Sequence, residues 1–227
     1  FSNFSSSLLN IRSLFLTFAL TALLFAGNRA VAAECTPLVY TRSFTDRSVG
    51  DFTIFSEAGN YYRWSANQYG AVLNGYNSSD AESDWLISPA FALSGYKSAT
   101  LSFYHTCYKG TDLSKAADYL KLKVCDFDDS IINYWMNGEA TIIWNELPIS
   151  TFSGSDFVRV EITLPEDYLK DNVRFAFHYT SDPNDKPHAY YWEIKDFALT
   201  ADCEESGGQQ EPAATYLPIA NTFYDFD

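Results

Sequence analysis

Hydrophobic and polar residues alternate with a period of two along much of the chain, which is the pattern of β-strands that bury one face. In 120–124, Leu-Lys-Leu-Lys-Val, the apolar residues share one face and the lysines share the other. In 174–179, Arg-Phe-Ala-Phe-His-Tyr, the aromatic residues line one face, while Arg174 and His178 line the opposite one. Half-buried antiparallel strands of a two-sheet sandwich have this pattern.

Clusters of Gly, Asn, Asp, Ser and Pro separate the apolar runs and mark turns. Helical structure is expected only as short turns, at 113–117 and at 165–170, where Pro165 can occupy a first helical position. No amphipathic pattern extends beyond two helical turns, so the sequence predicts an all-β domain. The strands are expected at 38–44, 52–56, 61–65, 69–73, 84–87, 99–106, 119–125, 141–147, 157–163, 173–179 and 191–199.

One stretch stands at the centre of this pattern. Trp85, Leu86 and Ile87 form an apolar core segment, and Pro89 has no backbone N–H to donate to a central ladder. The period of two resumes in the next strand, 99–106. We expect two strands of a sandwich joined by a turn, with Trp85 buried for structural reasons.

A family resemblance rests on the motif Trp85-Leu86-Ile87-Ser88-Pro89 and on the strand Leu101-Ser102-Phe103. Both resemble the secreted jelly-roll domains called cleaved adhesin or choice-of-anchor J domains, in which W-L-I-S-P precedes a strand of the form L-S-F. Further similar segments follow the family's order at 50–53, 144–147, 173–179 and 191–194. The resemblance covers about 40–199 and implies a two-sheet antiparallel β-sandwich of jelly-roll type, galactose-binding-like or MAM-like, that serves as a binding module.

Residues 1–33 have the pattern of a secretory signal peptide: Arg12 precedes an apolar run over 14–27, and small residues follow at 30–33. The run is too short and interrupted for a comfortable membrane span, and a retained N-terminal anchor is the alternative. The chain begins with Phe1, so its start is expected to lie upstream. We expect an exported protein that is extracellular, periplasmic or on the cell surface. The family resemblance implies that the cell is bacterial.

The composition changes after Cys203. Residues 204–214 lack an apolar period and are expected to form a flexible linker. Residues 215–227 are again aromatic and apolar, which predicts the start of a further domain, with a docking tail as the alternative. The folded domain is therefore expected to span 35–203.

The formal net charge is −14, and removing 1–33 would remove Arg12 and Arg29 and no acid, which gives −16. Such a surface repels phosphate backbones and anionic lipid. Nucleic acid and membrane surfaces are therefore not expected as partners, apart from the leader's own membrane contact.

Four cysteines in an exported chain predict two disulfides, with three possible connectivities. Because the first and last strands of a jelly roll commonly run near each other, the family fold favours Cys35 with Cys203. Cys107 and Cys125 then remain as the second pair. Strand parity opposes this pair, since Cys107 shares the face of Leu101 while Cys125 falls on the lysine face of its strand, so a bulge would be needed. Two buried free thiols are the alternative.

The resemblance also implies a structural calcium ion near the sandwich ends, because family members often carry one. In many of them the last strand reads W-E-I-D, whereas here Lys195 stands at the fourth position. Asp46, Glu193 and Asp196 are the candidate calcium ligands, and solvated or ion-paired carboxylates are the alternative. The run 126–129 is not a helix-loop-helix calcium loop, since Ile131 stands where that loop needs glycine.

Catalytic motifs are not found. The three histidines, His105, His178 and His188, do not have metal-ligand spacing on a common element, and the sequence contains no nucleophile elbow, phosphate loop or zincin motif. No enzymatic activity is expected.

Aromatic residues gather in or beside the turns, where Tyr and Trp can stack on sugar faces or anchor protein interfaces. The alternative is that they fill the core. The candidate binding residues are Tyr61, Tyr62, Trp64, Tyr76 and Tyr190, and Tyr69 and Tyr191 lie in the same clusters.

Two functions follow from these observations. The first is a secreted, non-catalytic adhesion or binding module for a carbohydrate or protein surface. The second is a carbohydrate-binding accessory domain of a larger secreted hydrolase.

Overall fold

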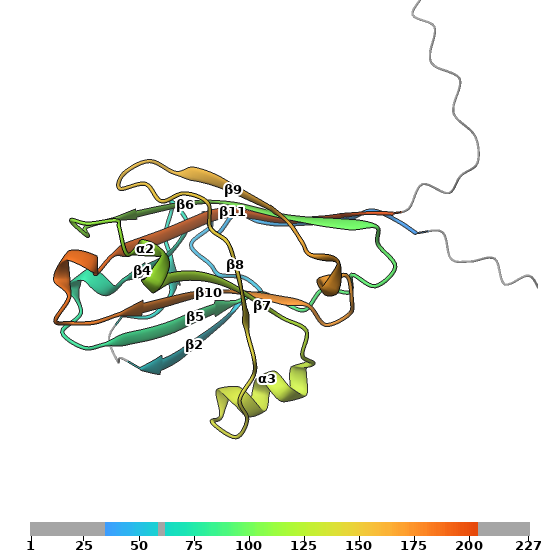
Figure 1. Ribbon diagram of the computed structural model, residues 1–227, viewed down its shortest axis with the longest axis horizontal. Coiled ribbons are helices and arrows are strands. Elements are labelled where there is room, and N and C mark those ends of the chain that lie inside the picture. The colour runs from blue at the N-terminus through green and yellow to red at the C-terminus, as the bar shows by residue number, and fades with distance from the viewer. Residues whose placement is uncertain (1–34, 59–61, 204–227) are drawn as a thin grey trace, which may run out of the picture. The chain divides into compact units, whose positions relative to one another are not determined.

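The structure of the protein is a computed structural model that describes residues 35–58 and 62–203, all within the unit Cys35–Asp227. These residues form two antiparallel β-sheets packed face to face, as Figure 1 shows. The predicted all-β, two-sheet sandwich of jelly-roll type is therefore confirmed. The predicted signal peptide 1–33, linker 204–214 and segment 215–227, together with Tyr61, lie outside the described residues.

Sheet A has six strands in the order β3-β4-β11-β6-β9, with β1 also paired to β11. Strand β11 is the longest of the described strands and holds β1 and β4 on one side and β6 on the other. A register shift against β6 falls between Lys195 and Ala198. The bounds are β1 Leu38–Arg42, β3 Ser65–Ala66, β4 Ala71–Asn74, β6 Ser98–Tyr108, β9 Val158–Thr163 and β11 Tyr191–Asp202.

Sheet B has five strands in the order β2-β5-β10-β7-β8. Their bounds are β2 Thr53–Ala58, β5 Glu82–Ile87, β7 Leu120–Cys125, β8 Asn145–Leu147 and β10 Arg174–Ser181. The described helical segments are η1 Gly75–Asn77, α2 Ala116–Tyr119, α3 Asp129–Met136, η2 Glu166–Tyr168 and η3 Lys186–His188. Helices α2 and η2 lie close to the two helical turns expected from the sequence, whereas α3 was not predicted.

The main core lies between the sheets and is rich in aromatic side chains. Phe177 of β10 meets Phe103 of β6 at 4.9 Å and Trp192 of β11 at 5.7 Å between ring centroids, both edge to face. Aromatic pairs favour this geometry because a positive ring edge meets a negative ring face. Alternate residues of β7, Leu122 and Val124, and of β10, Phe175, Phe177 and Tyr179, supply this core, as the alternation predicted.

The motif strand β5 contributes to two cores. Leu86 points between the sheets, while Trp85 and Ile87 point to the outer face of sheet B. Trp85 is 4 % exposed, so its predicted burial is confirmed. The strand ends at Ile87, and Ser88 Oγ then accepts a hydrogen bond from the backbone N–H of Phe175 at 2.9 Å.

Helix α3 covers the outer face of sheet B and creates a second core there (Figure 1). Trp135 of α3 meets Trp85 at 5.0 Å, edge to face. Asp128 begins the helix, because its carboxylate accepts the Ile131 N–H at 3.1 Å as an N-cap. The acidic run rejected as a calcium loop is therefore a helix start. The second core consists of Trp85, Ile87, Cys125, Ile132, Trp135, Ile142 and Ala176.

Helix α3 also changes the surroundings of the outer face of β10. The half-buried pattern predicted that this polar face would be exposed to solvent. His178 stacks on the Trp85 ring at 3.7 Å, and Arg174 pairs with Asp129 of α3 and donates to the Ser88 carbonyl at 3.0 Å. Both side chains are buried. The period of two was correct, but the polar face of β10 does not face solvent.

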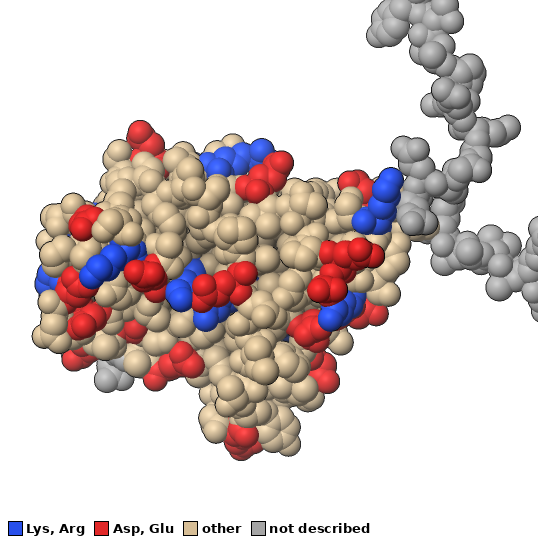
Figure 2. All heavy atoms as spheres, viewed as in Figure 1, with Lys and Arg blue, Asp and Glu red and all other residues tan. Residues whose placement is uncertain are grey.

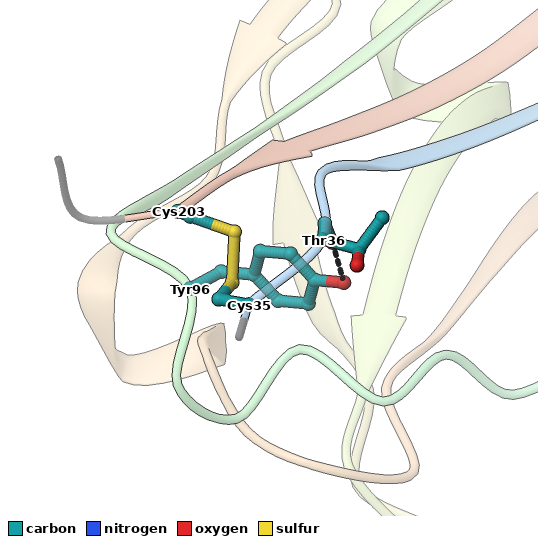
Figure 3. The surroundings of a disulfide bond; sticks show 4 residues. All are labelled: Cys35, Thr36, Tyr96 and Cys203. Atoms are coloured by element: carbon teal, nitrogen blue, oxygen red, sulfur yellow. Dashed lines mark hydrogen bonds between the residues drawn. A yellow bond between two sulfur atoms is a disulfide. The ribbon is translucent and has the colours of Figure 1, made fainter. Parts of the chain in front are cut away.

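The predicted disulfide between Cys35 and Cys203 is present (Figure 3). It joins Cys35, before β1, to Cys203, just after β11, and β1 pairs along its whole length with the C-terminal part of β11. Beside it, the Tyr96 hydroxyl donates to the Thr36 carbonyl at 2.9 Å. Its cysteines are separated by 168 positions in the sequence, and for a loop of this length the chain-entropy model assigns the bond about 5 kcal/mol of stabilisation.

The predicted second disulfide is wrong, because Cys107 and Cys125 are both buried free thiols. Cys107 lies on the inner face of β6 in the main core, whereas Cys125 lies on the outer face of β7 in the second core. The parity argument against this pair was therefore correct. Burial raises the thiol pKa of each cysteine to about 11, so neither is a reactive thiolate at neutral pH.

Within the described ranges, no helix is long and apolar enough to cross a membrane.

Candidate functional site

The outer face of sheet A carries a stacked tyrosine pair beside a hollow lined by aromatic, amide and cationic side chains. Along β11, Trp192 and Ile194 point into the main core. Side chains alternate along a strand, so Tyr191, Glu193 and Lys195 project from the opposite face. Helix α3 packs on the outer face of sheet B, and its buried residues Ile132 and Trp135 belong to the second core there.

A hollow of about 380 Å³ lies on this face. Strands β3 and β4 and the segment before them form one wall, and Tyr191 of β11 forms the other. The hollow combines aromatic, amide and cationic groups, which can contact both the apolar faces and the hydroxyls of a ligand. Its lining residues are Tyr62, Arg63, Trp64, Ser65, Val72, Asn74 and Tyr191.

Two tyrosines from neighbouring strands stack beside the hollow. Tyr191 and Tyr108 are direct cross-strand partners, and their rings stack at 4.4 Å with an interplanar angle of 27°. Burial raises the pKa of Tyr108, and the hydrogen bond between the two hydroxyls raises it further. Tyr108 is therefore neutral at physiological pH, and the pair presents a partly exposed aromatic surface.

Glu193 lies in the adjacent cross-strand row, opposite Val72 of β4 and Thr106 of β6. It is 4 % exposed, and burial raises the pKa of its carboxyl group, while the Asn67 hydrogen bond and nearby Lys195 favour the charged form. Its Oε1 atom is buried without a hydrogen-bond partner among the described residues. Asn74 of β4 is the cross-strand partner of Tyr191, and its Oδ1 atom is also buried without a hydrogen-bond partner among the described residues.

We call Tyr62, Arg63, Asn74, Tyr108, Tyr191 and Glu193 the tyrosine cleft. It brings together one predicted binding residue, Tyr62, and one predicted calcium ligand, Glu193. Sequence reasoning missed Arg63, Asn74 and Tyr108 as members. The alternation along β11 could have selected Tyr191 over Tyr190, because Tyr191 shares its face with Glu193 and Lys195.

Two predicted binding residues are core residues instead. Trp64 is 2 % exposed, packs on Trp192 at 5.4 Å and donates from its indole N–H to the Asp84 carbonyl at 3.2 Å. Tyr190 is 0 % exposed, and its hydroxyl donates to the Asp112 carbonyl at 2.6 Å. Tyr76, in contrast, is 36 % exposed within η1 and is not among the residues that line the hollow.

The candidate calcium ligands are not gathered into one site. Among the described residues, no group of three His, Cys, Asp or Glu side chains could hold a metal ion. Asp46 forms an ion pair with Arg42 at 2.8 Å, and Asp196 lies at the register shift of β11 with φ of 53°. Calcium binding at Asp46, Glu193 and Asp196 stays a prediction, which calcium titration of the unfolding temperature would test.

One histidine lies at hydrogen-bonding distance from a serine hydroxyl. Ser83 Oγ is 3.0 Å from His178 Nε2, but it also donates to the Glu57 carboxylate at 2.7 Å. His178 Nδ1 has no hydrogen-bond partner in the described ranges, and burial lowers the pKa of this imidazole to about 3. An activated nucleophile needs a base that is held by a third group, and this pair lacks that group.

No model of a known protein family and no curated protein matches the sequence. Several solved structures are similar at 9% to 12% identity. The K3 cleaved adhesin domain of Lys-gingipain from Porphyromonas gingivalis W83 is 12% identical, with a TM-score of 0.43 over 70% of this chain and 97% of that one. The CBM22-2 xylan-binding domain of Paenibacillus barcinonensis Xyn10C is 9% identical, with a TM-score of 0.45 over 71% and 98%. TmCBM61, solved with β-1,4-galactotriose, is 11% identical, with a TM-score of 0.40 over 70% and 94%.

Proposed function

We propose that this domain is a non-catalytic binding module that recognises carbohydrate through the tyrosine cleft. The observation that carries the proposal is the stacked pair Tyr108 and Tyr191, placed beside a hollow that also contains Asn74 and Arg63. Sugar rings have apolar C–H faces and polar edges. A site for them therefore combines exposed aromatic rings with hydrogen-bonding groups at their rim.

Each group of the cleft then has a separate role. The tyrosine rings provide the stacking surface for a pyranose ring. Glu193 and Asn74 accept hydrogen bonds from sugar hydroxyls, and Arg63 donates to hydroxyl oxygens. All except Tyr62 and Arg63 lie on strands of one sheet, so the site is held by backbone ladders rather than by loops.

Export is part of the proposal. Its support is the leader pattern at 1–33 and the bond between Cys35 and Cys203, because structural disulfides persist in oxidising compartments. The W-L-I-S-P motif supports membership of the cleaved adhesin or choice-of-anchor J class. An adhesin module and an accessory domain of a larger hydrolase would both use the same cleft, and whether the gene also encodes a hydrolase domain would distinguish them.

The test is the Tyr191→Ala variant, screened against immobilised polysaccharides and measured by isothermal titration with any polysaccharide that binds. We expect the affinity to fall at least about tenfold, because the main stacking surface is lost. Tyr134→Ala is the matched control, since Tyr134 is a 54 % exposed tyrosine on α3. This helix packs against sheet B and not against the sheet that carries the cleft. Equal binding by both variants would show that the cleft is not the site.

A further inference from the structure

We propose that the binding face continues from the tyrosine cleft to a second subsite around Tyr104, so that the domain takes an extended glycan chain rather than a single sugar. The second subsite consists of Tyr104, Phe157 and Lys195, all at the outer face of sheet A. The inference rests on the proposed function, because it names the size of the ligand that the same face would bind.

The cleft and the second subsite are carried by the same two strands. Phe103 of β6 belongs to the main core, so Tyr104 and Tyr108 project from the outer face of that strand. Tyr108 pairs with Tyr191 of β11, Tyr104 pairs with Lys195, and the register between these two pairs is unbroken. Both pairs therefore lie on the same face of the two strands.

Three segments of the chain contribute to the second subsite. Tyr104 comes from β6, Lys195 from β11 and Phe157 from the position just before β9. The Lys195 ammonium group lies 4.2 Å from the centroid of the Phe157 ring and 5.9 Å from that of the Tyr104 ring. Cation–π contacts of this kind hold the lysine side chain against the two rings.

These groups have the chemistry of a sugar subsite. The Tyr104 side chain is 37 % exposed, and Phe157 is half-buried beside it. An exposed aromatic ring can stack on the apolar face of a pyranose ring, and the ammonium group can donate hydrogen bonds to its hydroxyl oxygens. The second subsite therefore repeats the combination of aromatic and hydrogen-bonding groups found in the tyrosine cleft.

The spacing of the two tyrosines of β6 sets the size of the ligand. Tyr104 and Tyr108 are four positions apart in one strand, and a strand rises about 3.3 Å per residue, so their Cα atoms are about 13 Å apart. A pyranose ring is much shorter than this distance. One sugar can therefore contact either place, whereas contact with both requires several linked sugars. Such a chain gains the second contact without a second loss of translational freedom, so it binds more tightly than a short fragment.

The test is a series of oligosaccharides of increasing length, measured by isothermal titration with the intact protein. The probes are β-1,4-linked xylo-, cello- and galacto-oligosaccharides and oligogalacturonides, each from the disaccharide to the hexasaccharide. In any series that binds, we expect the hexasaccharide to bind at least about tenfold more tightly than the disaccharide. Tyr104→Ala should remove most of that gain and leave disaccharide binding unchanged, whereas Tyr191→Ala should weaken the binding of both.

Two further variants serve as controls. Tyr104→Phe keeps the stacking ring and should keep the gain with length, and Tyr134→Ala should bind every probe like the natural protein. Unfolding temperatures would confirm that each variant is folded.

Equal affinity for the disaccharide and the hexasaccharide would overturn the second subsite, and so would unchanged hexasaccharide binding in Tyr104→Ala. If Tyr191→Ala still lost affinity in those titrations, the proposed function would stand without the second subsite. Failure of every oligosaccharide to bind would count against both proposals.

Discussion

The two outer faces of the sandwich are both rich in aromatic residues, yet they differ in what covers them. The outer face of sheet B carries Trp85 and His178 and lies beneath α3, which supplies Trp135. The outer face of sheet A carries Tyr108 and Tyr191, which stack beside a hollow lined by residues of β3, β4 and β11 and of the segment before β3. In Figure 2 the projecting region of α3 shows few charged side chains on the visible face. The aromatic side chains of the sheet B face have become core, whereas Tyr108 and Tyr191 of the sheet A face stay partly exposed.

The choice of residue follows that difference. Trp85 and Trp135 bring large apolar areas, and the Trp85 indole N–H donates to Glu57 at 3.0 Å. The tyrosines of sheet A keep hydroxyl groups that can meet water or a ligand. An aromatic strand face therefore indicates function only when nothing packs on it, and this can be seen only in the folded structure.

The largest effect should come from removing the centre of the sheet B face. Trp85→Ala should lower the free energy of unfolding by about 3–5 kcal/mol, because it leaves a cavity beneath α3. Urea melts followed by circular dichroism would measure it. A loss below about 1 kcal/mol would mean that α3 does not form a second core, and the contrast between the two faces would disappear.

Lowering the pH should also destabilise the fold through His178 on the sheet B face. Burial lowers the pKa of His178 from 6.5 to about 3, so the unfolded chain binds the proton more readily than the folded one between these values. The contribution of His178 to the free energy of unfolding is therefore constant above pH 6.5. It decreases as the pH falls towards 3, by up to about 3 kcal/mol at pH 4. His178→Phe keeps an aromatic ring on Trp85 but cannot titrate. Its unfolding free energy should fall less than that of the natural protein between pH 7 and pH 4, and equal falls would contradict this account.

The helix start offers a smaller and more local test. Asp128→Ala removes the carboxylate that accepts the Ile131 N–H, which should cost about 1 kcal/mol. Hydrogen exchange should show faster exchange in α3 and no change in sheet A. Asp126→Ala is a suitable control, because Asp126 pairs with the exposed Lys170 and does not cap α3. Equal destabilisation by both variants would argue against the cap.

The smallest effect on stability should come from the sheet A face. Tyr191→Ala should change the free energy of unfolding by less than about 1 kcal/mol, because the ring is only partly buried and one stacking contact is lost. The same variant should have the large effect on carbohydrate binding described above. A stability loss comparable to that of Trp85→Ala would make Tyr191 a core residue and would remove the main support for the cleft.

Much of the fold could be predicted from the sequence because strand periodicity is local. The alternation in 120–124 placed the lysines of β7 on its outer face, and the apolar and aromatic runs located each described strand to within a few residues. The pairing of Cys35 with Cys203 followed from the family fold. The same alternation opposed a bond between Cys107 and Cys125, which the structure leaves as free thiols.

The tertiary structure decided which of these faces are covered. Tyr190 and Tyr191 are adjacent in the sequence, yet one hydroxyl bonds the Asp112 carbonyl inside the domain and the other ring lies beside the hollow. Helix α3 helped to bury the polar side of β10. Its Asp129 pairs with Arg174, and its Trp135 packs on Trp85, whose ring stacks on His178, although these residues are far apart in the sequence. Periodicity fixes which side chains share a face of a strand, but burial depends on what packs against that face, and this is set by contacts between residues far apart in the chain.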